Sequence, residues 1–373
     1  MLTPLDDYPI HQTPLPIAHP VSGDPNHYDR YWFNGYRDDL YFAVAMATYP
    51  NRDIIDAAFS VVSGGRQRSV FASGRLPRDR RETKIGPITI EIVEPLRVNR
   101  VRVDAPEHGL VADLTYRART IAIEEPRQTM YQGSRLVMDS TRLTQWGGWS
   151  GTIESGGARI DVELTNTFGT KDRSWGVRPV GAPTPVAPQS TAPQIFFLWA
   201  PLQFDDCCTH FMVFERGDGT PLVKSGAIVP VLRDDDAPTW GVDDAYEHLA
   251  GGEHAITWER GLRRAREATL TLRRASGAAE TVLLEPLLTF RMRGVGYMHP
   301  TRAHGNWHGE LDVHGEDLGV DELDTVEPWS IHVQQVMRAT WGTRTGMGVL
   351  EQLAVGPHAP SGLTGLFDGF TPT

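Results

Sequence analysis

The sequence predicts an all-β fold made of two antiparallel β-barrel or β-sandwich halves, and three observations lead to that prediction. Glycine (37) and proline (27) together make up about 17% of the 373 residues, against roughly 12% in average proteins, and both disfavour helices. Short segments alternate apolar and polar residues, as strands with one buried face do. A proline-rich segment separates two halves of similar length that share several sequence patterns.

Strands are predicted where the hydrophobic pattern repeats every two residues. Ile88–Val93, Arg97–Val103 and Glu267–Leu272 alternate in this way. Asp39–Met46 and Gln194–Trp199 are nearly continuous apolar runs, and we expect them to be strands buried on both faces.

Turns and helices follow from the remaining local signals. The pairs Gly64-Gly65 and Gly156-Gly157, together with Asp218-Gly219, are typical of hairpin turns. One short helix is expected, at about Val242–Leu249. The chain therefore consists almost entirely of strands and tight connections.

The segment Gly181–Pro193 contains four prolines and no charge, which is typical of an extended linker. It predicts an N-terminal β domain at 1–180 and a C-terminal β domain at 194–373. The pattern G-x-W-x-G-x-aliphatic occurs at Gly147–Ile153 and again at Gly305–Leu311. Three further pairs in the same order are Ala58–Val62 with Val213–Arg216, Ile88–Glu91 with Ile256–Glu259, and Arg173–Trp175 with Pro328–Ser330. We interpret these pairs as the trace of an internal duplication.

Charge and composition exclude several kinds of partner. The net charge is −11, with no basic run, so a nucleic-acid partner is not expected. No apolar stretch is long enough for a membrane span, and the first 20 residues lack the apolar core of a signal peptide. Cys207 and Cys208 are adjacent, where a disulfide would be strained, so we expect reduced cysteines and a cytoplasmic location. A homodimer is left open.

The first candidate site is the segment Gly169–Pro179 (GTKDRSWGVRP). In a strand, Asp172 and Arg173 point to opposite faces, and Trp175 shares the face of Arg173. A carboxylate near apolar tryptophan has a raised pKa and becomes a candidate general acid. Arg173 and Arg178 could hold an anionic oxygen. The alternative is an Asp–Arg ion pair that closes a turn.

The second candidate site is the histidine-rich segment Gly296–Glu310. If the segment is extended, His304, His308 and Glu310 share a face, which is compatible with a metal site. Acid–base catalysis by His304, polar ligand contacts or surface histidines are the alternatives. We predict that His304 acts in catalysis without a metal, and that the site needs no cofactor. Four further residues are predicted to bind the ligand: Tyr31, Tyr297, His299 and Trp307.

A family resemblance follows from these residues. The duplicated, tryptophan-rich pattern, with Asp172-Arg173-Ser174-Trp175-Gly176 near the end of the first half, resembles the lipocalin-like double-barrel superfamily. That group includes carotenoid 1,2-hydratases, AttH-type proteins and fungal Diels–Alderase-type cyclases. Their motif usually reads D-[HK]-x-W-G, and Arg173 stands here in place of His or Lys. The resemblance implies a large apolar pocket near the interface of the halves, with Asp172 as the acid and Trp175 as an aromatic wall.

Together these patterns lead to a functional hypothesis. We expect a lyase, hydratase or isomerase that acts by acid–base catalysis on a small hydrophobic or aromatic molecule, such as a terpenoid, a steroid or a plant-derived aromatic compound. Asp172, His304 and Arg173 are the predicted catalytic residues. Trp146, Trp149, Trp175 and Trp307 are expected to shape the pocket. The alternatives are a non-catalytic carrier of hydrophobic ligands and a metal-dependent enzyme.

Overall fold

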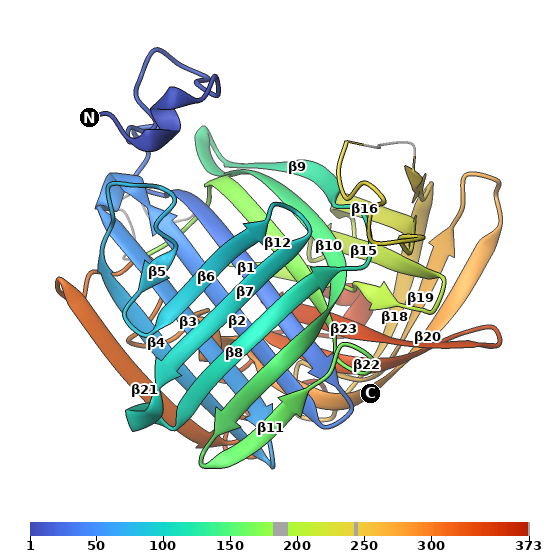
Figure 1. Cartoon of the computed structure of the whole chain (residues 1–373). Coiled ribbons are helices and arrows are strands. Elements are labelled where there is room, and N and C mark those ends of the chain that lie inside the picture. Colours follow the sequence, from blue (N-terminus) through green and yellow to red (C-terminus); the bar gives the residue numbers. More distant parts are fainter. Residues whose placement is uncertain (182–192, 242–244, 372–373) are drawn as a thin grey trace.

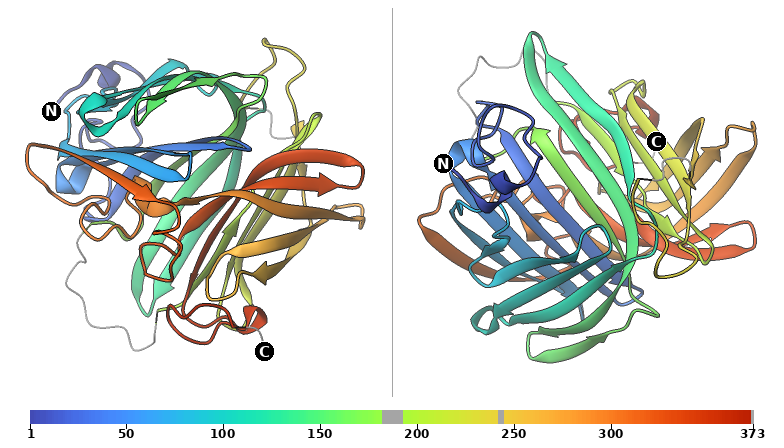
Figure 2. Two further views of the ribbon diagram at one scale, coloured as in Figure 1. Left: turned by 90° about the horizontal axis from the view of Figure 1, so that it is seen from below. Right: turned by 45° about the horizontal axis from the view of Figure 1, so that its top comes forward.

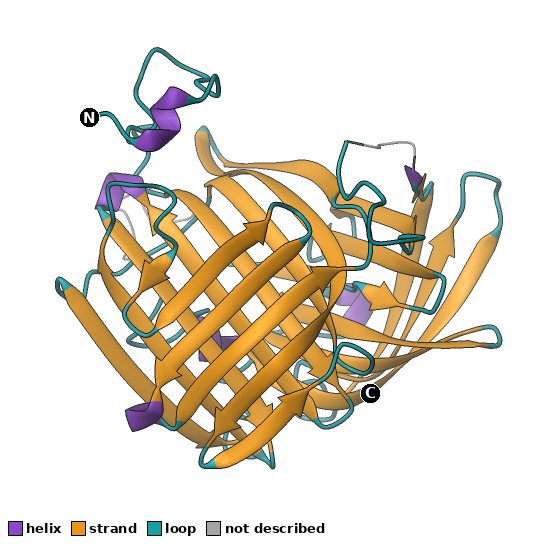
Figure 3. Cartoon of the chain, viewed as in Figure 1, coloured by secondary structure: helices purple, strands orange, loops and turns teal. Residues whose placement is uncertain are grey.

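The computed structural model describes residues 1–181, 193–241 and 245–371, and nearly all of its regular structure is β (Figure 3). Two large antiparallel sheets form the molecule. The first sheet curls into a near-barrel, and the second packs against one side of it (Figures 1 and 2). The predicted all-β fold with two barrel or sandwich units is confirmed.

The first sheet has 13 strands, with the order β21-β4-β3-β2-β1-β12-β10-β8-β7-β6-β5, and β9 and β11 pair with β10. Its strands are β1 (His27–Arg37), β2 (Leu40–Tyr49), β3 (Ile54–Ser63), β4 (Arg66–Arg75), β5 (Lys84–Ile85), β6 (Ile88–Glu94), β7 (Val98–Ala105), β8 (Leu110–Ala118), β9 (Ile123–Gln132), β10 (Arg135–Ser155), β11 (Ala158–Val162), β12 (Phe168–Val177) and β21 (Leu311–Gly319).

The second sheet has 10 strands, with the order β17-β16-β15-β13-β23-β22-β20-β19-β18, and β14 pairs with both β15 and β23. Its strands are β13 (Ile195–Trp199), β14 (Leu202–Gln203), β15 (Cys207–Glu215), β16 (Pro221–Pro230), β17 (Glu247–His248), β18 (Gly251–Trp258), β19 (Ala265–Arg273), β20 (Ala279–Arg291), β22 (Val333–Trp341) and β23 (Arg344–Val355).

Helical structure in the described residues is limited to short 3₁₀ turns, which are η1 (Pro4–Asp7), η2 (Pro50–Arg52), η3 (Pro106–His108), η5 (Met292–Val295) and η6 (Ala359–Ser361). The helix expected at about 242–249 is wrong where it can be examined, because Glu247–His248 forms the edge strand β17. Residues 242–244 of that prediction lie outside the described residues, as do residues 182–192 of the predicted linker.

Several local predictions are confirmed. Gly64 and Gly65 have φ angles of 56° and 75° between β3 and β4, a conformation that favours glycine in tight hairpins. Cys207 and Cys208 are both buried free thiols. No helix in the described parts of the chain has the length and apolar character needed to cross a membrane.

Strand β21 departs from the expected division of the chain. Its residues come from the C-terminal half, yet it pairs along its whole length with β4 at the edge of the first sheet, from Leu311–Gly74 to Gly319–Arg66. Figure 1 shows it as the orange strand beside the blue strands. The sheets therefore do not separate at the linker, because the second half contributes one strand to the first sheet.

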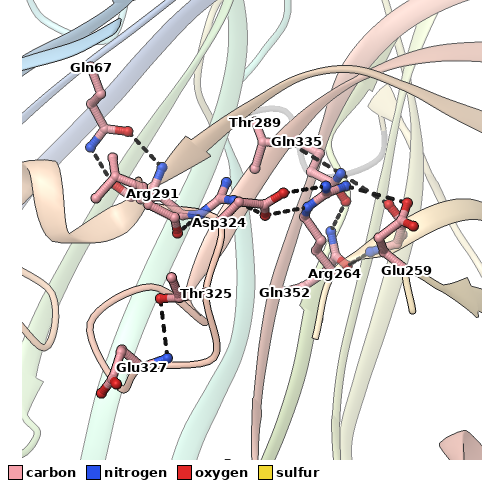
Figure 4. A network of polar contacts seen from close by, with 12 residues as sticks. Gln67, Glu259, Arg264, Thr289, Arg291, Asp324, Thr325, Glu327, Gln335 and Gln352 are labelled. Carbon is pink, nitrogen blue, oxygen red and sulfur yellow. Dashed lines mark hydrogen bonds and ion pairs between the residues drawn. The ribbon is translucent and has the colours of Figure 1, made fainter. Parts of the chain in front are cut away.

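A polar network anchors the segment that follows β21 to the second sheet (Figure 4). Asp324 accepts two hydrogen bonds from Arg264 of the β18–β19 connection, at 2.9 and 2.8 Å, and one from Arg291 of β20 at 2.5 Å. Arg291 is only 4% exposed. A buried guanidinium needs such a partner, so the contact fixes the path by which the chain leaves the first sheet.

The four paired sequence patterns do not occupy equivalent structures throughout. Gly147–Ile153 lies within strand β10, whereas residues 305–310 of its counterpart form the end of a turn and irregular chain before β21 begins. Arg173–Trp175 lies in β12, and Pro328–Ser330 forms a turn. The other two pairs lie in strands on both sides, except for their last residues Arg216 and Glu259. Duplication stays a prediction, and two of the pairs that suggested it are not matched in local structure.

Three of the five apolar clusters among the described residues fill the two sheets and the space between them. One fills the interior of the first barrel, around Phe33 and Trp149, and another lies within the curve of the second sheet, around Phe211 and Trp258. The third lies between the sheets, where Trp32 of β1 shares a cluster with residues of the second sheet. We call this contact region the seam. It is the region where side chains from both halves of the chain meet.

Candidate functional site

Strand β12 directs Asp172 into the seam. Its neighbours in the pairing register are Trp32 on β1 and Thr144 on β10, and the side chains of a strand alternate between faces. Lys171 and Arg173 therefore point to the barrel interior. Asp172 is 8% exposed, so the alternation predicted from the sequence is confirmed and sets Asp172 and Arg173 on opposite sides of the sheet.

Arg142 lies between two buried carboxylates. Its Nε is 3.2 Å from Asp172 Oδ2, and its Nη1 is 3.8 Å from Glu125 Oε2. Glu125 also accepts a hydrogen bond of 2.6 Å from Thr144 Oγ1, and its Oε1 is 3.3 Å from His210 Nε2 of the second sheet. The cluster therefore joins β9, β10, β12 and β15 across the seam.

The two carboxylates differ in their pKa values. Burial raises the pKa of Asp172 to about 6, although the charge of Arg142 opposes the shift. Burial also disfavours ionisation of Glu125, but the charges of His210 and Arg142 outweigh it and lower the Glu125 pKa to about 2. Such a separation of pKa values typifies an acid paired with a permanently ionised neighbour. Asp172 is the member that can exchange a proton near neutral pH.

The second sheet contributes a chain of buried polar groups to the seam. His332 Nε2 lies 2.7 Å from Glu351 Oε1, and Gln334 Nε2 donates to Glu351 Oε2 at 2.6 Å. Gln334 Oε1 in turn accepts hydrogen bonds from Asn34 at 3.0 Å and from the Tyr41 hydroxyl at 2.5 Å, both in the first sheet. Burial opposes ionisation of Glu351, but its bond to His332 outweighs burial and lowers the Glu351 pKa.

A cavity of about 570 Å³ opens beyond the C-terminal end of β12, and Arg178, Tyr297 and His304 line it. These three are residues that the sequence predicts for the site. The ring of Tyr297 meets the ring of His332 edge-on, with centroids 4.8 Å apart. Between Asp172 and Arg178, the seam face of β12 carries only Ser174 and a glycine. No large side chain of that strand therefore separates the Asp172 cluster from the cavity.

His304 is held by charged groups on both of its ring nitrogens. Its Nδ1 is 3.6 Å from Asp56 Oδ1, and its Nε2 is 3.3 Å from Arg30 Nη2. Burial and the charge of Arg30 lower the pKa of His304 to about 4. The imidazole is therefore neutral at pH 7 and is able to accept a proton.

Arg30 connects the two groups that can exchange protons. It projects from β1 beside Ser174, on the seam face that carries Asp172, and its guanidinium carbon lies 4.4 Å from the centre of the Tyr297 ring. Arg30 is 3% exposed, and its Nε has no hydrogen-bond partner within the described part of the chain. A buried donor without an acceptor is a natural place for a ligand oxygen.

The predicted tryptophans do not form one pocket. Trp146 is fully buried at the seam, edge-on to His210 with ring centroids 6.4 Å apart. Trp149 lies instead in the barrel core, where its Nε1 donates to the Asn34 carbonyl at 2.8 Å. Trp175 and Trp307 are 40% and 48% exposed. Of these four predicted tryptophans, the structure therefore places only Trp146 at the seam.

The remaining predicted residues are also dispersed. Arg173 stacks on Tyr31 at the barrel mouth, with its guanidinium carbon 3.7 Å from the ring centre. His299 is bonded to Glu316 of β21, at 3.0 Å, and its ring meets that of Phe71 edge-on. Arg173 cannot act beside Asp172, because consecutive residues of a strand face opposite sides of the sheet.

The alternative metal site does not assemble. The segment that contains His304, His308 and Glu310 is formed of turns and irregular chain before β21, so its residues do not share the face that an extended strand would give them. His308 contacts Arg302, and Glu310 forms an exposed ion pair with Arg75. Among the residues that the structure describes, no group of three or more His, Cys, Asp or Glu side chains is arranged to hold a metal ion.

Sequence reasoning missed most of the residues that surround Asp172. Arg30 lies in the aromatic segment Tyr28–Tyr36 and had a local signal, as a lone cation among rings. Glu125, Arg142 and Glu351 had none, because each becomes part of the site only through pairing between strands or contact between sheets.

Comparisons with known proteins agree with the fold. An AttH-like protein from Nitrosomonas europaea matches with a TM-score of 0.54 and 13% identity, over 88% of this chain and 92% of that one. Kievitone hydratase from Nectria haematococca matches with a TM-score of 0.51 and 14% identity, over 87% of this chain and 88% of that one. The resemblance to the AttH-type double barrel is therefore confirmed for the fold.

Sequence comparisons add one family and no characterised relative. No curated protein matches the chain. The model of one family, described as a family of unknown function (DUF8625), matches residues 2–364. Because that match spans nearly the whole sequence, the chain belongs to the DUF8625 family.

Proposed function

We propose that this protein is a hydratase or related lyase that acts on a small apolar or aromatic molecule bound at the seam. The observation that carries the proposal is a buried carboxyl group, Asp172, with a pKa near 6, whose neighbour Arg30 contacts His304 in the lining of a cavity of about 570 Å³. Perturbed acids beside cavities are typical of catalytic sites. The fold shared with kievitone hydratase, which is named for a hydration, supports this choice of reaction.

The proposed reaction is the addition of water to a carbon–carbon double bond. Protonated Asp172 gives its proton to one alkene carbon, while His304 takes a proton from the water whose oxygen bonds to the other carbon. The product gains one hydrogen and one hydroxyl group, and the two side chains return to their starting states by exchanging a proton with solvent. Arg30 would hold an oxygen of the substrate, because its buried Nε lacks an acceptor among the residues that the structure describes.

Isotope incorporation tests this function directly. The purified protein would be incubated with aromatic and terpenoid alkenes in water enriched in ¹⁸O and deuterium, followed by mass spectrometry. We expect one compound to gain a single ¹⁸O and a single non-exchangeable deuterium. A ligand that binds tightly and returns unlabelled across the panel would identify a carrier instead. Heat-denatured protein is the control for uncatalysed addition.

The pH dependence of kcat/KM provides a second test. His304 must be neutral to accept a proton, so the rate rises as the pH increases through about 4. Asp172 must be protonated to donate one, so the rate falls as the pH increases through about 6. We expect a bell-shaped profile with its maximum near pH 5. In His304→Gln the acidic limb should disappear, and an unchanged profile in that variant would contradict the role of His304.

A further inference from the structure

The interior of the first barrel contains two basic side chains that the proposed reaction does not use. Lys171 and Arg173 share the barrel face of β12, two residues apart. Lys171 Nζ lies 5.9 Å from the ring centre of Phe33, and Arg173 lies over Tyr31. The rings of Tyr31 and Phe33 are nearly parallel, with centroids 6.3 Å apart. Two basic side chains therefore line one wall of the barrel.

These cations have few acceptors. Lys171 is 3% exposed, and its Nζ donates to Asn99 Oδ1 at 2.9 Å; no ion pair joins it to a carboxylate in the described part of the chain. Asn99 Nδ2, Arg173 Nε and Arg80 Nη1 are buried without hydrogen-bond partners among the described residues. Burial and the charge of Arg173 lower the pKa of Lys171 to about 7. The barrel thus holds an excess of buried donors, which is costly unless a ligand accepts from them.

A cavity of about 370 Å³ lies at the barrel mouth, and of these donor residues Arg80 and Arg173 contribute to its lining. Arg80, Arg173 and His27 line it, together with one carboxylate, Asp29, which is already bonded to Arg173 at 2.5 Å. Its other walls are largely apolar and come from Met46, Ile55 and the N-terminal residues Leu5, Ile17 and Pro20. Figure 2 shows the N-terminal segment at this end of the barrel. A cationic mouth with apolar walls stands out in a chain of net charge −11.

We propose that the mouth of the first barrel is a second binding site, separate from the seam, for a carboxylate that carries an apolar tail. The carboxylate accepts hydrogen bonds from Arg173 and Arg80 at the mouth and is attracted by Lys171 below them. The tail packs against Met46 and Ile17. Because β12 separates this site from Asp172, its occupation does not depend on the reaction proposed for the seam.

Calorimetric titration with octanoate, and with 1-octanol as the uncharged probe of equal length, tests the site. We expect octanoate to bind at least about tenfold more tightly than 1-octanol, because a charge-assisted hydrogen bond contributes that much to affinity. Lys171→Met and Arg173→Met should each weaken octanoate binding by a similar factor. Lys84→Met, which removes an exposed lysine elsewhere in the same sheet, is the matched control and should leave the affinity unchanged.

A second variant keeps the test decisive if Lys171→Met does not fold. Asn99→Asp places a carboxylate beside Lys171 and so supplies internally the acceptor that the ligand would provide. We expect this variant to fold and to lose octanoate binding. Equal affinity for the two probes, or undiminished octanoate binding in Asn99→Asp, would overturn the proposal. Loss of binding in Asp172→Asn alone would instead place octanoate at the seam.

Discussion

Replacing Asp172 by asparagine is expected to lower kcat for the proposed hydration by about 10²–10⁴-fold, the usual contribution of a positioned general acid. Asparagine preserves the oxygen that faces Arg142 Nε at 3.2 Å but has no acidic proton to deliver. Burial raises the pKa of Asp172 to about 6, so the folded state binds more protons than the unfolded state between about pH 4 and pH 6. Stability linked to this group therefore falls as the pH rises through that window.

The direction of this pH dependence allows an effect of Asp172→Asn on catalysis to be distinguished from an effect on folding. At pH 7 the ionised carboxylate disfavours the folded state, so Asp172→Asn should retain or raise the thermal unfolding midpoint while losing activity. Initial rates and a thermal melt of the same preparation would measure both effects. Asp113→Asn is the matched control, because Asp113 of β8 forms an exposed ion pair with Arg100 of β7 and should leave turnover unchanged. Full activity in Asp172→Asn would exclude it as the acid.

Replacing Gln334 by leucine is expected to cause the largest loss of stability, roughly 3 kcal/mol or more. Gln334 bonds Asn34 and Tyr41 of the first sheet and Glu351 of the second. Leucine has a similar size but leaves three buried polar groups without this partner, and each such group costs about 1–3 kcal/mol. The loss of unfolding free energy would be measured by urea denaturation at pH 7.

Gln132→Leu is the control for this variant, because Gln132 makes one exposed hydrogen bond, to Arg135 at the β9–β10 hairpin. It should change the unfolding free energy by less than about 0.5 kcal/mol. A similarly small effect in Gln334→Leu would mean that water or rearranged side chains satisfy the three groups. The seam would then be less rigid than its hydrogen bonds indicate.

The sequence predicted the parts of the fold that depend on local pattern. Alternation of residues in Ile88–Val93 predicted a strand, and Gly64-Gly65 predicted a tight hairpin, because both signals act between neighbours in the chain. The same alternation correctly assigned Asp172 and Arg173 to opposite faces of β12. It failed for His304 to Glu310, where turns replace an extended strand and remove the shared face on which the metal hypothesis depended.

The candidate site was only partly predictable for a related reason. Asp172, Tyr297 and His304 stood out because acidic, aromatic and imidazole groups occur in short, unusual segments. Arg142 and Glu351 lie in segments without such signals, and they reach the site through the pairing of β10 with β12 and through contact between the two sheets. Cross-strand partners are set by register, which a single sequence does not reveal.

By itself, the sequence determined that this protein is built of strands and tight turns, and which face of each strand its side chains share, because these properties arise from backbone preferences and from the two-residue period of a strand. Only the tertiary structure decided that β21 joins the first sheet and that Asp172 meets Arg142 and Glu125 in a buried seam. Those contacts join residues far apart in the chain, and burial among them, rather than the identity of Asp172 alone, raises its pKa to about 6.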